Sequence, residues 1–413
     1  MTHRRRRRLA ASRTALTILT AFGTLAGVAL VGAAPAGAAS DGTTLAPGIT
    51  YRQFDIDAGA GEAHAHLLTV DLANPHVSLD LLYPGAVAAR ATVSGLADAA
   101  GAVAGVNGDF FDISETQHPG VEATGASVGP AVAHGQALKA AVPRAQRFGP
   151  ALPPGTATTD VLGMGTDRRA RLDRLTLSGA VATPDGQLTL GGLNQYALPQ
   201  NSVGAYTSLW GSVSRERAVC GTDTSRADGC TTDTYEVTVR DGRVVSTSDH
   251  PGSGAVPADT TVLLGREAGA DELRKLSPGE QVTVRHELVP ATGGVPFVFA
   301  IGGYPVLRDG QALPGLDDSV SAVRTAAGFS SSGRTLFLLA LDGASAYRTG
   351  MTIAEEADTL RTLGASDAFN FDGGGSSELV ARPPAASRVT VRNHPSGGAE
   401  RPVANGIGVF STS

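Results

Sequence analysis

The feature that most constrains the fold is a strand, helix and strand pattern in the C-terminal third of the chain. The apolar run L-F-L-L-A-L is typical of a strand buried on both faces. The helix that follows begins at a capping box formed by Thr352 and Glu355, and Gly364 ends it. A second apolar run, D-A-F-N-F, completes the pattern. This order predicts a β-α-β unit with a right-handed crossover and parallel strands.

Each of the two predicted strands ends in an aspartate, Asp342 and Asp372. Open sheets with helices bind their ligands at the C-terminal edge of the strands. Behind Asp372 the chain continues with Gly373, Gly374, Gly375 and Ser376. Successive amides in a glycine-rich turn form a nest for anions, to which serine adds a hydroxyl donor. The turn therefore predicts a phosphate site, and the alternative is a glycine-rich hairpin without a ligand.

The N-terminal third repeats part of this pattern. Asn107-x-Asp109 follows an apolar run and a predicted helix, as Asn370-x-Asp372 does. If the two segments are equivalent, two Asn-x-Asp turns meet at one edge of a single sheet. Coincidence in a chain rich in alanine and glycine is the alternative.

Phosphate binding in an acidic protein requires a fixed cation, and Arg324 is the candidate. It lies just before the first apolar run, and arginine grips phosphate in a bidentate manner. A surface ion pair is the alternative role. The carboxylates Asp109, Asp342 and Asp372 suit a general acid, base or nucleophile, or the binding of a divalent cation that bridges to phosphate. For Asp109 and Asp342 the alternative is an aspartate that only shapes a turn.

The N-terminus predicts export. Five arginines precede an apolar stretch and the A-x-A cleavage site Ala36-Gly37-Ala38, so residues 1–38 are expected to be a secretory signal peptide. An uncleaved membrane anchor is the alternative, because the apolar stretch approaches the length of a span. We expect a secreted protein with no stable membrane association after cleavage.

Charge and cysteine content narrow the function classes. Loss of residues 1–38 removes six arginines and no acids, so the formal net charge moves from −6 to −12. An acidic protein of this kind is not expected to bind nucleic acid, which requires clustered basic residues. The pair Cys220 and Cys230 predicts a disulfide that closes a short loop, and it lacks the C-x-x-C spacing of redox motifs.

The rest of the chain predicts mostly strands. Residues 39–50 are expected to be a disordered lead-in, residues 51–104 a β-rich entry, and residues about 170–288 a β-rich middle region. His64 and His66 share one face of a predicted strand, which suits either a metal or, with no third ligand in sight, exposure to solvent. The expected fold class is α+β or mixed α/β: β-rich with a mixed sheet, the C-terminal β-α-β unit and few helices.

Several motifs together resemble the phosphodiester glycosidase family. They are G-V-N-G-D-F-F-D, R-T-A-A-G-F, F-N-F-D-G-G-G-S-S and R-P-V-A-N-G-I-G-V-F, and the resemblance runs from about Gly105 to Phe410 within a catalytic region 51–413. It implies hydrolysis of a sugar-phosphate diester, with a phosphorylated glycan as substrate. The site residues that it implies are Asn107, Arg324, Thr325, Asp372, Gly373, Gly374, Ser376 and Asn405. Asp109 departs from the family's N-G-G-F-F form, which leaves the role of this carboxylate open.

Two chemical routes remain open at this point. Cleavage on the sugar side uses two carboxylates, about 5 Å apart for retention or about 6.5 to 9.5 Å apart for inversion. Cleavage on the phosphorus side uses Arg324, the glycine nest and an optional metal ion. The competing classes are a secreted glycan-binding or matrix protein without turnover, and a phosphodiesterase that acts on a non-sugar substrate.

Overall fold

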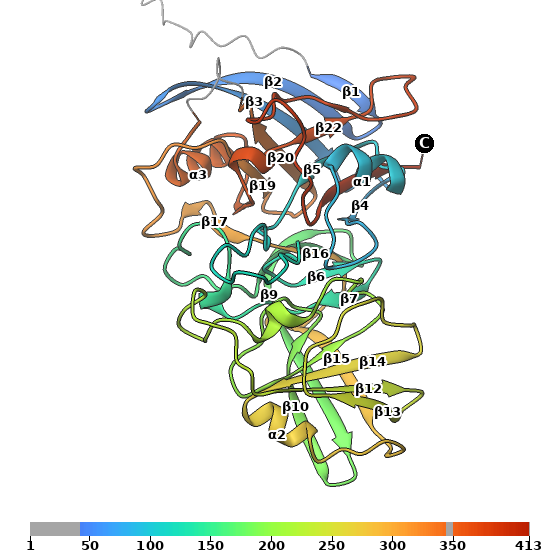
Figure 1. Ribbon diagram of the computed structural model, residues 1–413. Helices are drawn as coiled ribbons and strands as arrows, with labels where there is room; N and C mark the ends of the chain where they lie inside the picture. The colour runs from blue at the N-terminus through green and yellow to red at the C-terminus, as the bar shows by residue number, and fades with distance from the viewer. Residues whose placement is uncertain (1–41, 344–349, 413) are drawn as a thin grey trace, which may run out of the picture. The chain divides into compact units, whose positions relative to one another are not determined.

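The computed structural model describes residues 42–343 and 350–412 (Figure 1). The predicted signal peptide and residues 39–41 lie outside the described residues. The segment expected to be a disordered lead-in instead contains strand β1 and the start of β2. The two strands pair antiparallel, with Thr43 opposite Tyr51. Pairing with β2 satisfies the backbone N–H and C=O groups of β1. The polar sequence of this segment does not by itself indicate a strand.

An eight-stranded sheet contains β21 (Asp367–Asn370), the strand that leads into the glycine-rich turn. Its strand β20 (Thr335–Leu341) is buried along nearly its whole length, as expected for an apolar strand with both faces covered. Its order is β1-β2-β3-β20-β19-β21-β17-β18. The bounds are β1 (Thr43–Ala46), β2 (Ile49–Ala58), β3 (Gly61–Asp71), β20 (Thr335–Leu341), β19 (Thr325–Phe329), β21 (Asp367–Asn370), β17 (Tyr304–Arg308) and β18 (Gln311–Ala312).

The expected β-α-β unit is present only in a modified form. Strands β20 and β21 both pair antiparallel with β19, so they run in the same direction but are not neighbours. Helix α3 (Ile353–Thr362) connects them and packs on β17, β19 and β21 (Figure 1). The two strands have the predicted common direction, but β19, which comes earlier in the chain, lies between them.

A five-stranded sheet, ordered β23-β22-β5-β24-β4, carries the first Asn-x-Asp segment. All of its pairs are antiparallel, and helix α1 (Val93–Ala100) packs on β4, β5 and β22. The bounds are β23 (Thr390–Val391), β22 (Leu379–Ala381), β5 (Ala104–Asn107), β24 (Gly406–Ser411) and β4 (Val77–Leu82).

An eleven-stranded sheet occupies most of the middle of the chain, and helix α2 (Ala268–Leu273) packs on β12 and β14. Its order is β13-β12-β14-β11-β10-β9-β8-β16-β6-β7, with β15 paired to β9. The bounds are β6 (Ala131–Ala133), β7 (Gln136–Lys139), β8 (Asp160–Gly165), β9 (Ala170–Thr183), β10 (Gly186–Leu193), β11 (Val203–Tyr206), β12 (Thr234–Arg240), β13 (Arg243–Ser248), β14 (Thr260–Arg266), β15 (Thr283–Pro290) and β16 (Phe297–Gly302).

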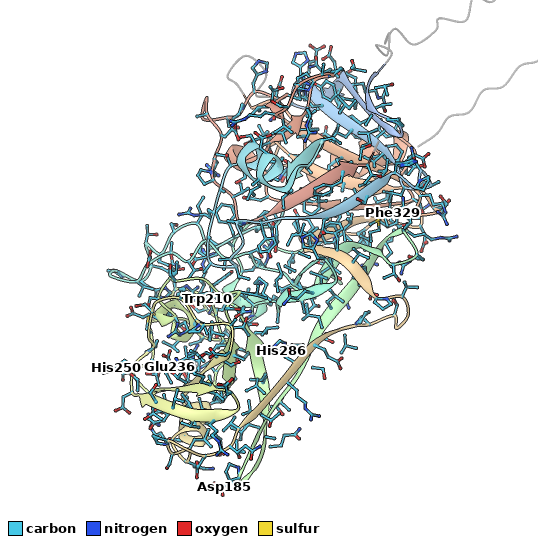
Figure 2. The ribbon with its side chains drawn as sticks, turned by 90° about the vertical axis from the view of Figure 1, so that its right-hand side faces the viewer. Asp185, Trp210, Glu236, His250, His286 and Phe329 are labelled. Carbon is cyan, nitrogen blue, oxygen red and sulfur yellow. A yellow bond between two sulfur atoms is a disulfide. The ribbon has the colours of Figure 1, made fainter. Side chains whose placement is uncertain are left out.

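This sheet is mixed, because β10 and β11 pair in parallel while the other described pairs run antiparallel. Figure 2 shows Asp185 at the tip of the hairpin between β9 and β10, and His286 on β15. The expectation of a β-rich fold with a mixed sheet and few helices is therefore confirmed: the described residues form three α-helices among their strands.

The helix predicted from the capping box has the expected first turn. The Thr352 amide donates to Glu355 Oε2 at 2.7 Å, and the Glu355 amide donates to Thr352 Oγ1 at 3.2 Å. Ile353, Ala357 and Leu360 are buried on the face that packs against the sheet. Local capping and one apolar face thus specify α3 before any tertiary contact is considered.

We predict that Thr352→Ala lowers the free energy of unfolding by about 1 kcal/mol, because the first turn of α3 loses its side-chain cap. Chemical denaturation measures the change. Thr362→Ala, at the exposed last turn of the same helix, is the control and is expected to stay within about 0.5 kcal/mol of the parent protein. Equal effects of both substitutions would contradict the role of the cap.

Candidate active site

The two Asn-x-Asp turns meet directly, although their strands belong to different sheets. Asn107 Nδ2 donates to the Asp372 carbonyl at 2.7 Å, and the Asp372 amide donates to the Gly108 carbonyl at 2.9 Å. Asn107 Oδ1 accepts from Thr325 Oγ1 at 2.8 Å and from the Glu378 amide at 3.0 Å. The expected meeting at an edge of one sheet was wrong. A buried asparagine instead joins the five-stranded and the eight-stranded sheets.

Asp372 lies at this junction and is partly exposed. Burial raises the pKa of Asp372 to about 6. Hydrogen bonds from Ser376 and from the Gly373 amide oppose the rise, as do the charges of Arg401 and Arg147. A carboxyl that titrates near neutrality beside fixed cations is suited to proton transfer.

Asp109 is a second carboxyl with a raised pKa. It is buried, and its Oδ2 accepts from the Gly129 amide at 2.6 Å, while Oδ1 has no hydrogen-bond partner among the described residues. Burial raises the pKa of Asp109 to about 6, against the charges of Lys139 and Arg147. Gly302 is required beside it, because a Cβ there would lie 2.4 Å from Asp109 Oδ2.

Two residues from other segments act on Asp109, one through a hydrogen bond to its backbone and one through its charge. The Asp109 amide donates to Asn405 Oδ1 at 3.0 Å, so Asn405 holds the backbone of the first turn, and its part in lining the site stays a prediction. Lys139 Nζ is fully enclosed and donates to the carbonyls of Val128, Gly129 and Ala140. Burial lowers the pKa of Lys139 to about 7, although the nearby Asp109 opposes this shift.

Asp342 forms a separate cluster. Its Oδ1 accepts from the His394 amide at 2.6 Å and lies 3.0 Å from His66 Nε2, and its Oδ2 lies 3.1 Å from His394 Nδ1. These contacts outweigh burial and lower the pKa of Asp342 to about 2. His66 is buried in this cluster and therefore does not face solvent. Asp342 is thus held as an ionised partner of two histidines, and its catalytic role stays a prediction.

The side chain of Arg324 does not extend along the glycine turn. Its Nε donates to the Met351 carbonyl at 2.9 Å, and its Nη2 donates to the Val320 carbonyl at 2.7 Å. The Arg324 charge acts on Glu356 of α3, whose two carboxyl oxygens are buried without a partner among the described residues. Burial raises the pKa of Glu356 to about 8.

The glycines of the turn serve close packing. A Cβ at Gly373 would lie 2.5 Å from the Val323 carbonyl oxygen, and Gly374 has a φ of +59°. The Gly374 amide donates to the Val323 carbonyl at 2.8 Å, and the Ser376 amide donates to the Gly373 carbonyl at 3.1 Å. The amides expected to form an open anion nest are therefore largely occupied within the chain.

The cation at the glycine turn is Arg401. A Cβ at Gly375 would lie 2.2 Å from Arg401 Nη2, and Arg401 Nη1 donates to Ser376 Oγ at 3.4 Å. Arg401 opens the closing motif R-P-V-A-N, so the sequence contained a signal for it that we did not use. The second missed cation, Arg147, lies in a loop segment without periodicity, and no sequence pattern singles it out.

Arg147 links the carboxylates to a hollow. Its guanidinium lies 5.1 Å from the centroid of the Phe110 ring, and its charge acts on Asp109 and Asp372. The hollow has a volume of about 370 Å³. It is lined by both charged and apolar groups: Arg144, Ala145, Arg147, Gly149, Pro150, Ala151, Leu152 and Asp223.

Asn370 and the cysteines complete the predicted set. Asn370 Nδ2 donates to the Phe371 carbonyl at 2.9 Å, and its buried Oδ1 has no partner within the described part of the chain. Cys220 and Cys230 form the predicted disulfide. In residues 42–343 and 350–412, side chains with the spacing of metal ligands converge at Asp55, Glu62 and His64, on the β2–β3 hairpin. A divalent cation near Asp372 thus stays a prediction.

The candidate site thus combines two carboxyls with raised pKa values, Asp109 and Asp372, with the charges of arginines, and it lies in a β-rich fold. Residues 233–410 match the family model described as Phosphodiester glycosidase. The match confirms the family resemblance for this part of the chain, which contains Arg324, Thr325, Asp372 and Asn405. Asn107 and Asp109 lie before the matched range. No curated protein matches the chain.

Solved structures support the fold. A hypothetical protein from Synechocystis has a TM-score of 0.66 and 20% identity over 88% of this chain, which covers 62% of that protein. A putative exported protein from Burkholderia pseudomallei has a TM-score of 0.64 and 23% identity, with 86% of this chain and 76% of that one covered.

The zebrafish N-acetylglucosamine-1-phosphodiester alpha-N-acetylglucosaminidase catalytic domain, auto-inhibited by its pro-peptide, is a more distant match. It has a TM-score of 0.44 and 16% identity, with 91% of this chain and 87% of that one covered. Separately, none of the helices in the described residues has the length and apolar character needed to cross a membrane.

We predict that Asp342→Asn lowers the free energy of unfolding at pH 7 by roughly 1 to 2 kcal/mol. The pKa of Asp342 is lowered to about 2, so its stabilisation is complete above the ordinary carboxyl pKa of about 4 and is lost as pH falls towards 2. Denaturation curves from pH 7 to pH 2 should therefore converge for parent and variant. Asp358→Asn, which removes an exposed ion pair with Arg361, is the control and should change stability little.

Proposed function

We propose that the protein is a secreted hydrolase that cleaves a sugar-phosphate phosphodiester, removing a terminal sugar such as N-acetylglucosamine from a phosphodiester-linked glycan. One observation carries the proposal: Asp109 and Asp372 both have a pKa raised to about 6, the Arg147 charge acts on both, and the Arg401 charge acts on Asp372. The family match over residues 233–410 agrees with this class of reaction.

The arginines are assigned to the phosphate of the substrate. A phosphodiester carries one negative charge, and arginine binds its oxygens through paired N–H donors. Arg401 lies against the Gly375 backbone and Ser376, so its position is restricted on one side. Arg147 supplies the second charge. Arg324, which the sequence suggested for this role, is assigned to holding the segment around Met351.

Asp372 is assigned as the general acid. Burial raises its pKa to about 6, so a substantial fraction carries a proton at mildly acidic pH. It donates that proton to the leaving oxygen while water attacks the reacting atom, and Asp109 accepts the proton from the water. Asn107 and Asn405 hold the backbone of the two turns so that the carboxylates keep their relative positions.

The proposal includes export and excludes nucleic acid as a partner. Residues 1–38 predict a signal peptide, and the Cys220–Cys230 disulfide is typical of proteins from oxidising compartments. The acidic charge after removal of the signal peptide disfavours phosphate-rich polymers. A small sugar phosphodiester with a single charge does not require a large basic surface.

The bond that breaks can be identified from hydrolysis in isotopically labelled water. Attack at the anomeric carbon forms a new C–O bond and labels the released sugar, whereas attack at phosphorus forms a new P–O bond and labels the phosphate. The first result assigns Asp109 and Asp372 as a glycosidase pair. The second assigns the arginines to a phosphoryl-transfer site.

We predict that Asp372→Asn lowers kcat on a chromogenic sugar-1-phosphodiester by about 100-fold or more, because the general acid is lost. Initial rates across a panel of sugar and non-sugar diesters measure the effect. Asp367→Asn, at the other end of β21, is the matched control and keeps normal turnover. Sugar-phosphate binding in calorimetry with no product from the parent protein would instead identify a glycan-binding protein.

We predict that Arg401→Ala raises KM about tenfold or more and moves the alkaline limb of the pH profile to higher pH. The Arg401 charge lowers the pKa of Asp372, so its removal lets that pKa rise and keeps the acid protonated at higher pH. Profiles of kcat/KM from pH 4 to pH 9 measure the shift. Arg388→Ala, an exposed arginine in the loop before β23, is the control. An unchanged profile for Arg401→Ala would remove Arg401 from the site.

A further inference from the structure

The loop closed by the disulfide packs against the segment that carries Arg147. We call residues 221–229 the disulfide loop and residues 144–152 the basic segment. Gln146 Nε2 donates to the Thr222 carbonyl at 2.6 Å and to the Ser225 carbonyl at 3.2 Å. Arg226 Nη1 donates to the Arg147 carbonyl at 2.9 Å. Three hydrogen bonds therefore join the loop to two adjacent residues of the segment.

Packing strengthens this connection. The Arg226 guanidinium lies 4.0 Å from the centroid of the Phe148 ring, within the range of a cation–π contact. Gly221 has a φ of +72°, and a Cβ there would lie 2.3 Å from Gln146 Nε2. Only glycine allows both this backbone conformation and the close approach. The start of the loop is thus shaped to fit the basic segment.

A buried ion pair supports the same segment from the protein interior. Arg217 Nη2 donates to Gln146 Oε1 at 3.0 Å, and Arg217 Nε donates to Glu115 Oε1 at 2.5 Å. His118 Nε2 lies 2.8 Å from the Asp228 carbonyl oxygen, which adds a contact to the far end of the disulfide loop. Gln146 is therefore held on both sides: its oxygen by the interior and its nitrogen by the loop.

These contacts restrict the position of Arg147. Its carbonyl accepts a hydrogen bond from Arg226, and its half-buried guanidinium lies beside Phe110 and donates to the Pro150 carbonyl. From there its charge reaches Asp109, which also lies in the field of Lys139, and Asp372, which lies in the field of Arg401. The loop also contributes Asp223 to the lining of the hollow beside Arg147.

We propose that the disulfide loop is a positioning element that holds the basic segment, and with it the Arg147 guanidinium, against the two site carboxylates. Its own residues do not take part in the reaction. Arg226 and Gln146 act through Arg147, and the Cys220–Cys230 bond keeps the two ends of the loop together. The effect of Arg147 on turnover rests on the proposed function, whereas its placement by the loop does not.

Arg226→Ala tests the placement without any substrate. It removes one hydrogen bond and the contact with Phe148, so the amides of residues 144–152 should exchange with deuterium about tenfold faster. Arg274→Ala is the matched control, because it also removes an arginine that makes a cation–π contact. The partners of Arg274 are Tyr235, Asp233 and Asp271, which lie outside the disulfide loop and the basic segment. Unchanged exchange of the basic segment in Arg226→Ala overturns the inference.

The pH profile then tests the connection to the site. Loss of the Arg147 charge from its position lets the pKa of Asp372, the proposed general acid, rise, so the alkaline limb of kcat/KM in Arg226→Ala should move to higher pH. A structural role confined to stability would leave the limb in place, and that result overturns the inference. Arg226→Lys, which keeps the charge and one donor, should recover part of the shift. An inactive parent protein contradicts only the proposed function, since the exchange experiment does not need turnover.

Discussion

The buried side chain of Asn107 is the interaction on which the candidate site depends. Its amide nitrogen and oxygen reach Asp372, Thr325 and Glu378, which lie on or beside strands of two different sheets. A buried amide without partners costs free energy, so this set of contacts favours one arrangement of the sheets over others. Because the same contacts hold the backbone of Asp372, Asn107 determines both the junction of the two sheets and the position of the Asp372 carboxyl.

The three candidate aspartates differ in pKa because their hydrogen-bond partners and neighbouring charges differ. Asp342 accepts hydrogen bonds from His66 and His394, and its pKa is lowered to about 2. Asp109 is buried and Asp372 is half-buried, both with fewer compensating bonds, and each has a pKa raised to about 6. Desolvation disfavours a charge, whereas hydrogen-bond donors and cations favour it. The balance between desolvation and these partners therefore keeps Asp342 ionised, whereas Asp109 and Asp372 have pKa values suited to proton transfer.

The predictions succeeded where the signal was local. The capping box at Thr352 and Glu355, the apolar strands β20 and β21 and the disulfide all follow from short stretches of sequence. Prediction failed for β19, which lies between β20 and β21, because strand order depends on pairing between distant segments. It failed in the same way for the lead-in, where β1 gains its structure from β2.

Short sequence motifs were enough to indicate the resemblance to the phosphodiester glycosidase family and the candidate residues Asn107, Thr325, Asp372 and Asn405. Only the tertiary structure decided which charges face them. It turns Arg324 towards the Val320 and Met351 carbonyls, and it brings Arg147 and Arg401 from segments hundreds of residues apart in the chain. The role of a single arginine cannot be predicted from a sequence pattern. It depends on which carboxylates or carbonyls the folded backbone places within reach of the guanidinium.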